Sequence, residues 1–152
     1  MKNVLLFFAF LLSCAASHAQ FCSDPNTLVK VYKTRTTNYE YVIFKIKKSF
    51  TGAYIVNPVT VPIPFDEGGV DPEPAFPSCK YLQVSFTGIG WMCKVNQQTG
   101  LATTRVKDVV RTGQFEGVIS YAVGYRCPAS KFLGHYAYDD GAFRKVVLRF
   151  RR

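Results

Sequence analysis

The strongest constraint on the fold is a repeated two-residue alternation of apolar and polar side chains. Residues 40–47 place Val42, Phe44 and Ile46 on one face of an extended chain and Tyr41, Ile43, Lys45 and Lys47 on the other. Residues 80–86 and 143–150 alternate in the same way. Period two is the pattern of half-buried β-strands, and no stretch of helical length shows a period near 3.6. The chain is therefore predicted to be all-β.

Gly and Pro separate the apolar runs into short segments, as expected for strands joined by turns. The predicted strands cover residues 28–32, 40–47, 53–56, 80–86, 103–110, 118–123, 132–138 and 143–150. Asp139-Asp140-Gly141 predicts a hairpin turn, and residues 112–117 predict a turn that leads into a buried strand. Many short strands with regular turns favour a small β-sandwich of two short-stranded sheets.

Residues 57–78 interrupt this rhythm, because they hold six of the eight prolines and four of the ten acidic residues. Proline cannot donate a hydrogen bond to a central strand, so this stretch is predicted to be a loop or an edge. Loops of this length in a small domain are usually either functional or without fixed structure.

The first 19 residues have the features of a secretory signal peptide. Lys2 precedes an apolar run from Val4 to Leu12, and Ser17-His18-Ala19 offers a cleavage site before Gln20. We therefore expect residues 20–152 to form one exported domain, secreted or periplasmic, with no transmembrane segment. An alternative is that Cys14 lies in a lipobox-like stretch and carries a lipid tether, although the apolar run begins early for that.

Four cysteines remain after such processing: Cys22, Cys79, Cys93 and Cys127. An even number in an exported chain predicts two disulfides that staple the sandwich. Three pairings exist, of which we favour Cys22–Cys79 with Cys93–Cys127. We expect no metal and no cofactor, since the sequence has no CxxC pair and only His135 remains of its two histidines.

The charge is strongly positive, with 19 Lys and Arg against 10 Asp and Glu. Such an excess attracts anionic polymers, although it also serves solubility alone. Export makes nucleic acid a poor candidate partner. The expected partner is an anionic cell-wall polymer or an envelope protein.

Four segments, in this order, resemble the AMIN-like domains of exported bacterial envelope proteins. They are YEYVIFKIKKSFTGAYIV, YLQVSFTGIG, VKDVVRTGQFEGVISYAVGY and FLGHYAYDDGAFRKVVLRF, which span about residues 38–150. The most specific parts are Phe115-Glu116-Gly117-Val118, with the strand that ends at Gly124, and Arg144 ahead of Val146-Val147. The resemblance implies a β-sandwich and a non-enzymatic role at the cell wall. AMIN domains proper associate with peptidoglycan.

Binding residues are expected where aromatic and basic side chains share the non-core face of a strand. The candidates are Tyr41, Lys45, Lys47, Tyr121 and Tyr125. Tyrosine rings stack on sugars, and lysines pair with acidic groups. Two alternatives remain: Tyr121 and Tyr125 fill the core, or Lys45 and Lys47, with Lys48, only solvate an edge.

Catalysis has little support in the sequence. His135 lies in a predicted strand, Asp139 and Asp140 are explained by a turn, and Glu116 and Asp108 are carboxylates by position only. We therefore expect a non-catalytic binding domain of the cell envelope for peptidoglycan or another anionic wall polymer. The alternative is a secreted module that binds a protein.

Overall fold

The computed structural model describes residues 27–59, 80–90, 103 and 105–152. These residues form eight strands and no helix. The strands are β1 (Leu28–Arg35), β2 (Tyr39–Lys47), β3 (Tyr54–Val59), β4 (Lys80–Thr87), β5 (Val106–Phe115), β6 (Val118–Tyr125), β7 (Lys131–Asp140) and β8 (Phe143–Arg151). All eight predicted strands are present, several of them longer than the sequence indicated.

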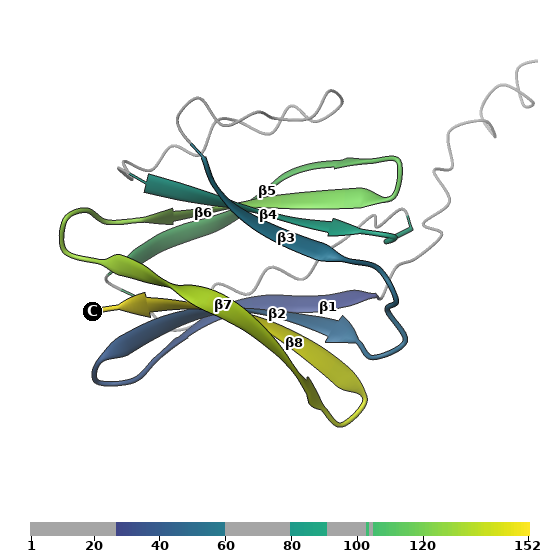
Figure 1. Cartoon of the computed structure of the whole chain (residues 1–152), viewed down its shortest axis with the longest axis horizontal. Helices are drawn as coiled ribbons and strands as arrows, with labels where there is room; N and C mark the ends of the chain where they lie inside the picture. The colour runs from purple at the N-terminus through teal and green to yellow at the C-terminus, as the bar shows by residue number, and fades with distance from the viewer. Residues whose placement is uncertain (1–26, 60–79, 91–102, 104) are drawn as a thin grey trace, which may run out of the picture.

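The strands form two antiparallel sheets of four strands, which lie one above the other (Figure 1). Sheet A has the order β1-β2-β8-β7, and sheet B has the order β3-β4-β6-β5. The chain therefore crosses between the sheets after β2, β4 is hydrogen-bonded to β6, and β7 and β8 return to sheet A. This architecture confirms the predicted all-β sandwich.

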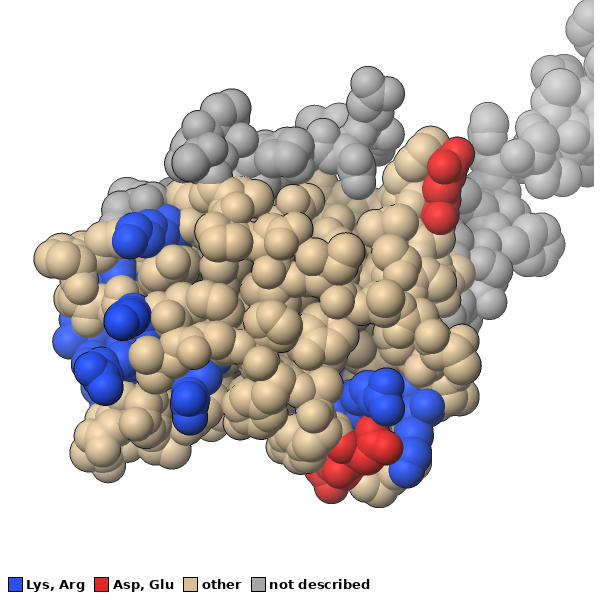
Figure 2. Space-filling view, viewed as in Figure 1, with Lys and Arg blue, Asp and Glu red and all other residues tan. Residues whose placement is uncertain are grey.

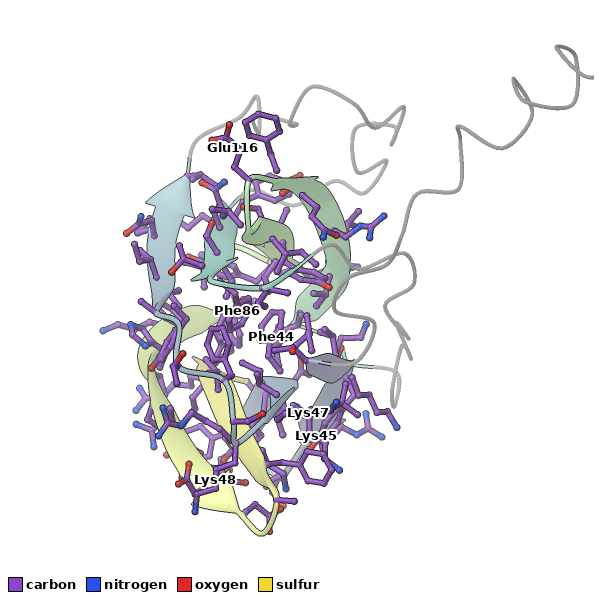
Figure 3. All side chains as sticks on the ribbon, turned by 90° about the vertical axis from the view of Figure 1, so that its right-hand side faces the viewer. Phe44, Lys45, Lys47, Lys48, Phe86 and Glu116 are labelled. Atoms are coloured by element: carbon purple, nitrogen blue, oxygen red, sulfur yellow. The ribbon has the colours of Figure 1, made fainter. Side chains whose placement is uncertain are left out.

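The core lies between the sheets and is built from the alternating apolar residues. Val42, Phe44 and Ile46 of β2 are fully buried, as predicted. The Phe44 ring lies 5.2 Å from the Phe86 ring of sheet B and 5.3 Å from the Tyr121 ring, measured between centroids. Figure 3 shows Phe44 and Phe86 between the two layers. Aromatic pairs of this kind add about 0.5–1.5 kcal/mol each beyond the apolar area that they bury.

The buried carboxylate of Glu40 ties the two sheets together at one end. Its Oε2 atom accepts hydrogen bonds from the backbone N–H groups of Arg105 (2.9 Å) and Val106 (2.8 Å), beside the start of β5. Its Oε1 atom lies 3.6 Å from Nε of Arg152. A buried charge is tolerated only when it is paired in this way, so Glu40 is a structural residue that joins β2 to β5.

Three predicted boundaries need correction. The turn predicted at Asp139-Asp140-Gly141 is the pair Gly141-Ala142, because Asp139 and Asp140 end β7 and are paired with β8. The predicted turn over residues 112–117 is only the pair Glu116-Gly117, because Thr112 to Phe115 continue β5. Both turn residues have positive φ (44° and 78°), as a two-residue hairpin requires, and the second register shift in β5 leaves Thr112 as the extra residue between Arg111 and Gly113. The predicted loop over 57–78 begins later, since Asn57, Pro58 and Val59 belong to β3. Pro58 is accommodated there because β3 is an edge strand.

The remaining predictions about chain organisation concern residues outside the described ranges. The leader (residues 1–19), the lipid-bearing alternative at Cys14 and most of the proline-rich stretch belong to this group. The described part of the chain contains no helix of the length and hydropathy needed to cross a membrane.

Candidate functional site

The outward face of sheet A is where aromatic and basic side chains meet. Because Val42, Phe44 and Ile46 point into the core, Tyr41, Lys45 and Lys47 of β2 point outward. The neighbouring strands add further outward residues in register. We call this surface the tyrosine–lysine face; it comprises Lys30, Tyr32, Tyr39, Tyr41, Lys45, Lys47, Tyr136, Tyr138, Phe143, Lys145, Arg149 and Arg151.

A row of lysines crosses this face perpendicular to the strands. Lys30 of β1 is paired in register with Lys45 of β2, and Lys45 is paired with Lys145 of β8. Neighbouring strands lie about 4.8 Å apart, so three positive charges are adjacent. Like charges directly opposite each other destabilise a sheet. Only Asp140, whose carboxylate is ion-paired with Lys145, is an acid facing this row among the described residues.

Each lysine of the row makes a cation–π contact with an aromatic ring. The Lys45 ammonium lies 3.7 Å from the ring centroid of Phe143, and the Lys30 and Lys145 ammonium groups lie 5.5 Å and 5.7 Å from the rings of Tyr32 and Tyr138. Each such cation–π contact is worth about 0.5–1 kcal/mol at an exposed site. These contacts hold the partly exposed lysines in place beside the rings.

A second aromatic–basic group lies at the opposite end of the same face. The Arg149 guanidinium lies 5.5 Å from the Tyr39 ring, and the Tyr39 and Tyr41 rings are 6.3 Å apart. Tyr136 and Tyr138 on β7 are stacked at 6.2 Å and are 45% and 43% exposed. The face therefore offers ring surfaces and cations along most of its length.

The ionisation of the groups on this face follows from their neighbours. A hydrogen bond from Lys145 lowers the pKa of Asp140 and raises the pKa of Lys145 itself. Burial raises the pKa of Tyr32, and the nearby Lys145 ammonium opposes that rise. All of these shifts keep the lysine charged and the phenol neutral near pH 7.

The five sequence-predicted binding residues do not lie on one surface. Tyr41, Lys45 and Lys47 lie together on the outward side of β2, and Figure 3 shows Lys45 and Lys47 on the side of sheet A that faces away from Phe86. Tyr121 and Tyr125 lie in sheet B and are buried in the core, with 0% and 6% exposure. These two tyrosines therefore fill the core, as the alternative interpretation held, and we leave them out of the site.

Several residues of the tyrosine–lysine face were missed at the level of sequence. Lys30, Tyr32, Tyr136, Tyr138 and Lys145 belong to it only because of the register between strands. The alternation in each strand predicts which side chains point outward, and the turn near Asp140 predicts that the last two strands pair with each other. The order β1-β2-β8-β7, which places the first and last hairpins side by side, was not readable from the pattern.

The residues considered for catalysis are spread over the molecule. His135 Nδ1 lies 3.3 Å from the Tyr54 hydroxyl, where β7 of sheet A meets β3 of sheet B. Glu116 is exposed in the β5–β6 turn, and Asp139 is ion-paired with Lys48 and Arg144. The described residues contain no group of three side chains suited to a metal ion.

Of the four cysteines expected in the mature chain, only Cys127 lies within the described residues, and it is disulfide-bonded. The number and connectivity of the disulfides stay predictions.

Comparison with known proteins adds no relative, because no family model, curated protein or solved structure matches the chain. The resemblance to the AMIN-like domains therefore stays a prediction.

Proposed function

We propose that the protein is an exported, non-catalytic binding domain of the cell envelope, and that its tyrosine–lysine face binds an anionic wall polymer such as peptidoglycan. The observation that carries this proposal is the row formed by Lys30, Lys45 and Lys145. Three adjacent like charges cost folding stability, and an alternating arrangement of charges would avoid this cost. A ligand that supplies negative charge along the row would remove the repulsion.

The rings beside the lysines favour a polysaccharide among anionic polymers. Tyrosine rings present flat apolar surfaces with a polar hydroxyl at the edge, which suits the C–H faces of sugars. Tyr41, Tyr136 and Tyr138 lie among cations on this face. Carboxylates and phosphates of a wall polymer would pair with the lysines while its sugar rings stack on the tyrosines.

Export belongs to the same proposal. The leader-like residues 1–19 and the even number of cysteines after it fit an oxidising compartment, with two disulfides that stabilise the sandwich. The AMIN-like resemblance leads to the same location, and peptidoglycan is the ligand of AMIN domains proper. A lipid on Cys14 would change the tether but not the binding face.

The test is co-sedimentation of the secreted, processed protein with purified sacculi at low and at physiological salt. The variant Lys30→Gln with Lys45→Gln removes two charges from the tyrosine–lysine face. Its matched control, Lys80→Gln with Lys107→Gln, removes two charges from sheet B. We expect the first pair to lower the affinity about tenfold, since two ion pairs of about 0.7 kcal/mol each are lost.

The control pair should change the affinity by less than about twofold. Equal losses in both pairs would mean that net charge alone causes retention, and would contradict a specific face. Absence of retention at both salt concentrations would exclude peptidoglycan. Binding to an envelope protein that survives high salt would instead support the protein-interaction alternative.

A further inference from the structure

The strands of the described residues leave four edge strands, and three of them are protected against pairing with another chain. Edge strands expose unpaired backbone N–H and C=O groups, which proteins guard with short strands, prolines, lysines or bulges. β1 has a register shift between Leu28 and Lys30 and carries several basic residues. β3 has six residues and contains Pro58. β5 has two register shifts.

β7 lacks these protections over most of its length. It has ten residues and one register shift, near its start between Phe132 and Gly134. From Gly134 to Asp140 its pairing with β8 is continuous, and residues 134–138 contain no proline, lysine or arginine. Two of the four exposed large hydrophobic side chains of the described residues, Tyr136 and Tyr138, lie on this strand.

The charged residues of β7 lie at its two ends, with the basic residue at the start and the acidic residues at the end. Lys131 begins the strand, and Asp139 and Asp140 end it. Figures 1 and 2 show the molecule from the side on which β7 crosses the front. In Figure 2 basic side chains gather at the end near the C-terminus, acidic and basic side chains lie together near the β7–β8 turn, and the middle of this face is uncharged. Such a strand is complementary to an antiparallel copy of itself.

We propose that β7 pairs with β7 of a second copy, antiparallel about a twofold axis at Tyr136. This inference goes beyond the proposed function and does not rest on it. With Tyr136 opposite Tyr136 of the second copy, Tyr138 lies opposite Gly134. The bulged residue Leu133 then shifts the register by one, so that Asp140 lies opposite Lys131.

The side-chain directions are consistent with this register. In β8 the partners of Gly134, Tyr136, Tyr138 and Asp140 are Arg149, Val147, Lys145 and Phe143, whose alternation with the buried Leu148 and Val146 places them outward. Lys131 is paired with Arg151 on the same outward face. Every proposed cross-copy pair therefore joins outward residues to outward residues. Each copy contributes one end of two Lys131–Asp140 ion pairs, in which the Asp140 carboxylate is shared between Lys131 of the second copy and Lys145 of its own chain.

The pairing would join two copies of sheet A into one eight-stranded sheet. The two tyrosine–lysine faces would then lie side by side on the same surface. An interface formed by one edge strand is small, so we expect a reversible, concentration-dependent dimer.

The first test is charge reversal, measured by sedimentation equilibrium of the secreted, processed protein. Lys131→Asp and Asp140→Lys each place like charges opposite each other in the pair and should raise the dimer Kd about five- to tenfold. The double variant restores both ion pairs and should return the Kd to within about twofold of the original. Within one copy the two residues are about 30 Å apart, so restoration requires contact between copies.

The second test locates the twofold axis by cross-linking. Tyr136→Cys places two thiols directly opposite each other, within reach of a disulfide between copies, and should give a covalent dimer under mild oxidation. Tyr138→Cys is the matched control, since its partner is Gly134, and should give little. A monomer at all concentrations, failure of the double charge variant to restore the dimer, or equal cross-linking of both cysteine variants would overturn the proposal.

Discussion

Sheet A and sheet B bury side chains of the same kind in the core, but they carry different side chains on the faces that point away from it. Ten lysines and arginines lie in the strands of sheet A, against three in those of sheet B. The side of sheet B that faces away from sheet A carries small neutral groups instead, such as Ser85 and the buried Ser120, whose hydroxyls are 2.9 Å apart. The shared core therefore accounts for folding, and the proposed binding face rests on the difference between the outward faces.

The largest expected effect comes from breaking the link between the sheets. Glu40→Gln keeps one acceptor for the Arg105 and Val106 N–H groups but turns an amide NH₂ toward the Arg152 guanidinium. Hydrogen bonds to a charged group are worth about 1.5–3 kcal/mol each, so we expect a loss of about 3 kcal/mol in the free energy of unfolding. Urea denaturation measures it.

Glu116→Gln is the matched control for that change, because Glu116 is exposed in the β5–β6 turn. It should alter the free energy of unfolding by less than about 0.5 kcal/mol. Similar values for the two variants would contradict the structural role of Glu40.

The next prediction compares how much an aromatic ring on each sheet contributes to binding. Tyr41→Ala removes a ring from the tyrosine–lysine face, and Phe115→Ala removes an exposed ring from sheet B. If sugars stack on sheet A, Tyr41→Ala should weaken binding to sacculi about five- to tenfold, as expected for a contact worth about 1–1.4 kcal/mol. Phe115→Ala should leave binding unchanged. The opposite ranking would move the ligand to sheet B.

The inward faces were predictable from sequence because alternation with period two reports burial directly. Val42, Phe44 and Ile46 were assigned to the core on this basis alone, and the structure confirms them. The outward face was predicted only in part, because its other members come from β1, β7 and β8. Their positions beside Lys45 depend on sheet order and register, which long-range pairing determines and local pattern does not.

The tyrosines also show what the alternation cannot predict. Tyr41 and Tyr121 both stand next to apolar residues in a strand, yet the first faces solvent and the second is fully buried. The run from Val118 to Tyr125 is apolar on both faces, so alternation gave no direction for its rings. Proline composition likewise marked an edge near residue 57 without showing that β3 continues through Pro58.

A smaller effect tests the core under sheet B. The hydroxyl of Tyr121 is buried and has no hydrogen-bond partner among the described residues. Tyr121→Phe removes this group at nearly constant volume, and we expect the free energy of unfolding to rise by about 1 kcal/mol. Differential scanning calorimetry at neutral pH measures the change, and a decrease of similar size would reveal a partner for the hydroxyl.

The same variant should change the response to alkali. Burial raises the pKa of Tyr121, so the folded state favours the neutral phenol. Stability is then full below the ordinary tyrosine pKa of about 10 and falls as pH rises above it, because only the unfolded chain ionises there. Tyr121→Phe should flatten this alkaline decline, and an unchanged decline would assign it to other groups.

The smallest effect tests the lysine row itself through the one acid that faces it in the described structure. A hydrogen bond from Lys145 lowers the pKa of the Asp140 carboxyl, and the charge of Lys45 contributes less. Asp140 therefore stabilises the fold above its ordinary pKa, and this contribution is lost as pH falls through the lowered value. An NMR titration of Asp140 in dilute protein should show the pKa rising strongly in Lys145→Gln, slightly in Lys45→Gln and not at all in Lys80→Gln. If Lys45→Gln left the pKa unchanged, the two lysines would not act on a common site, and sheet A would carry separate charges instead of a row.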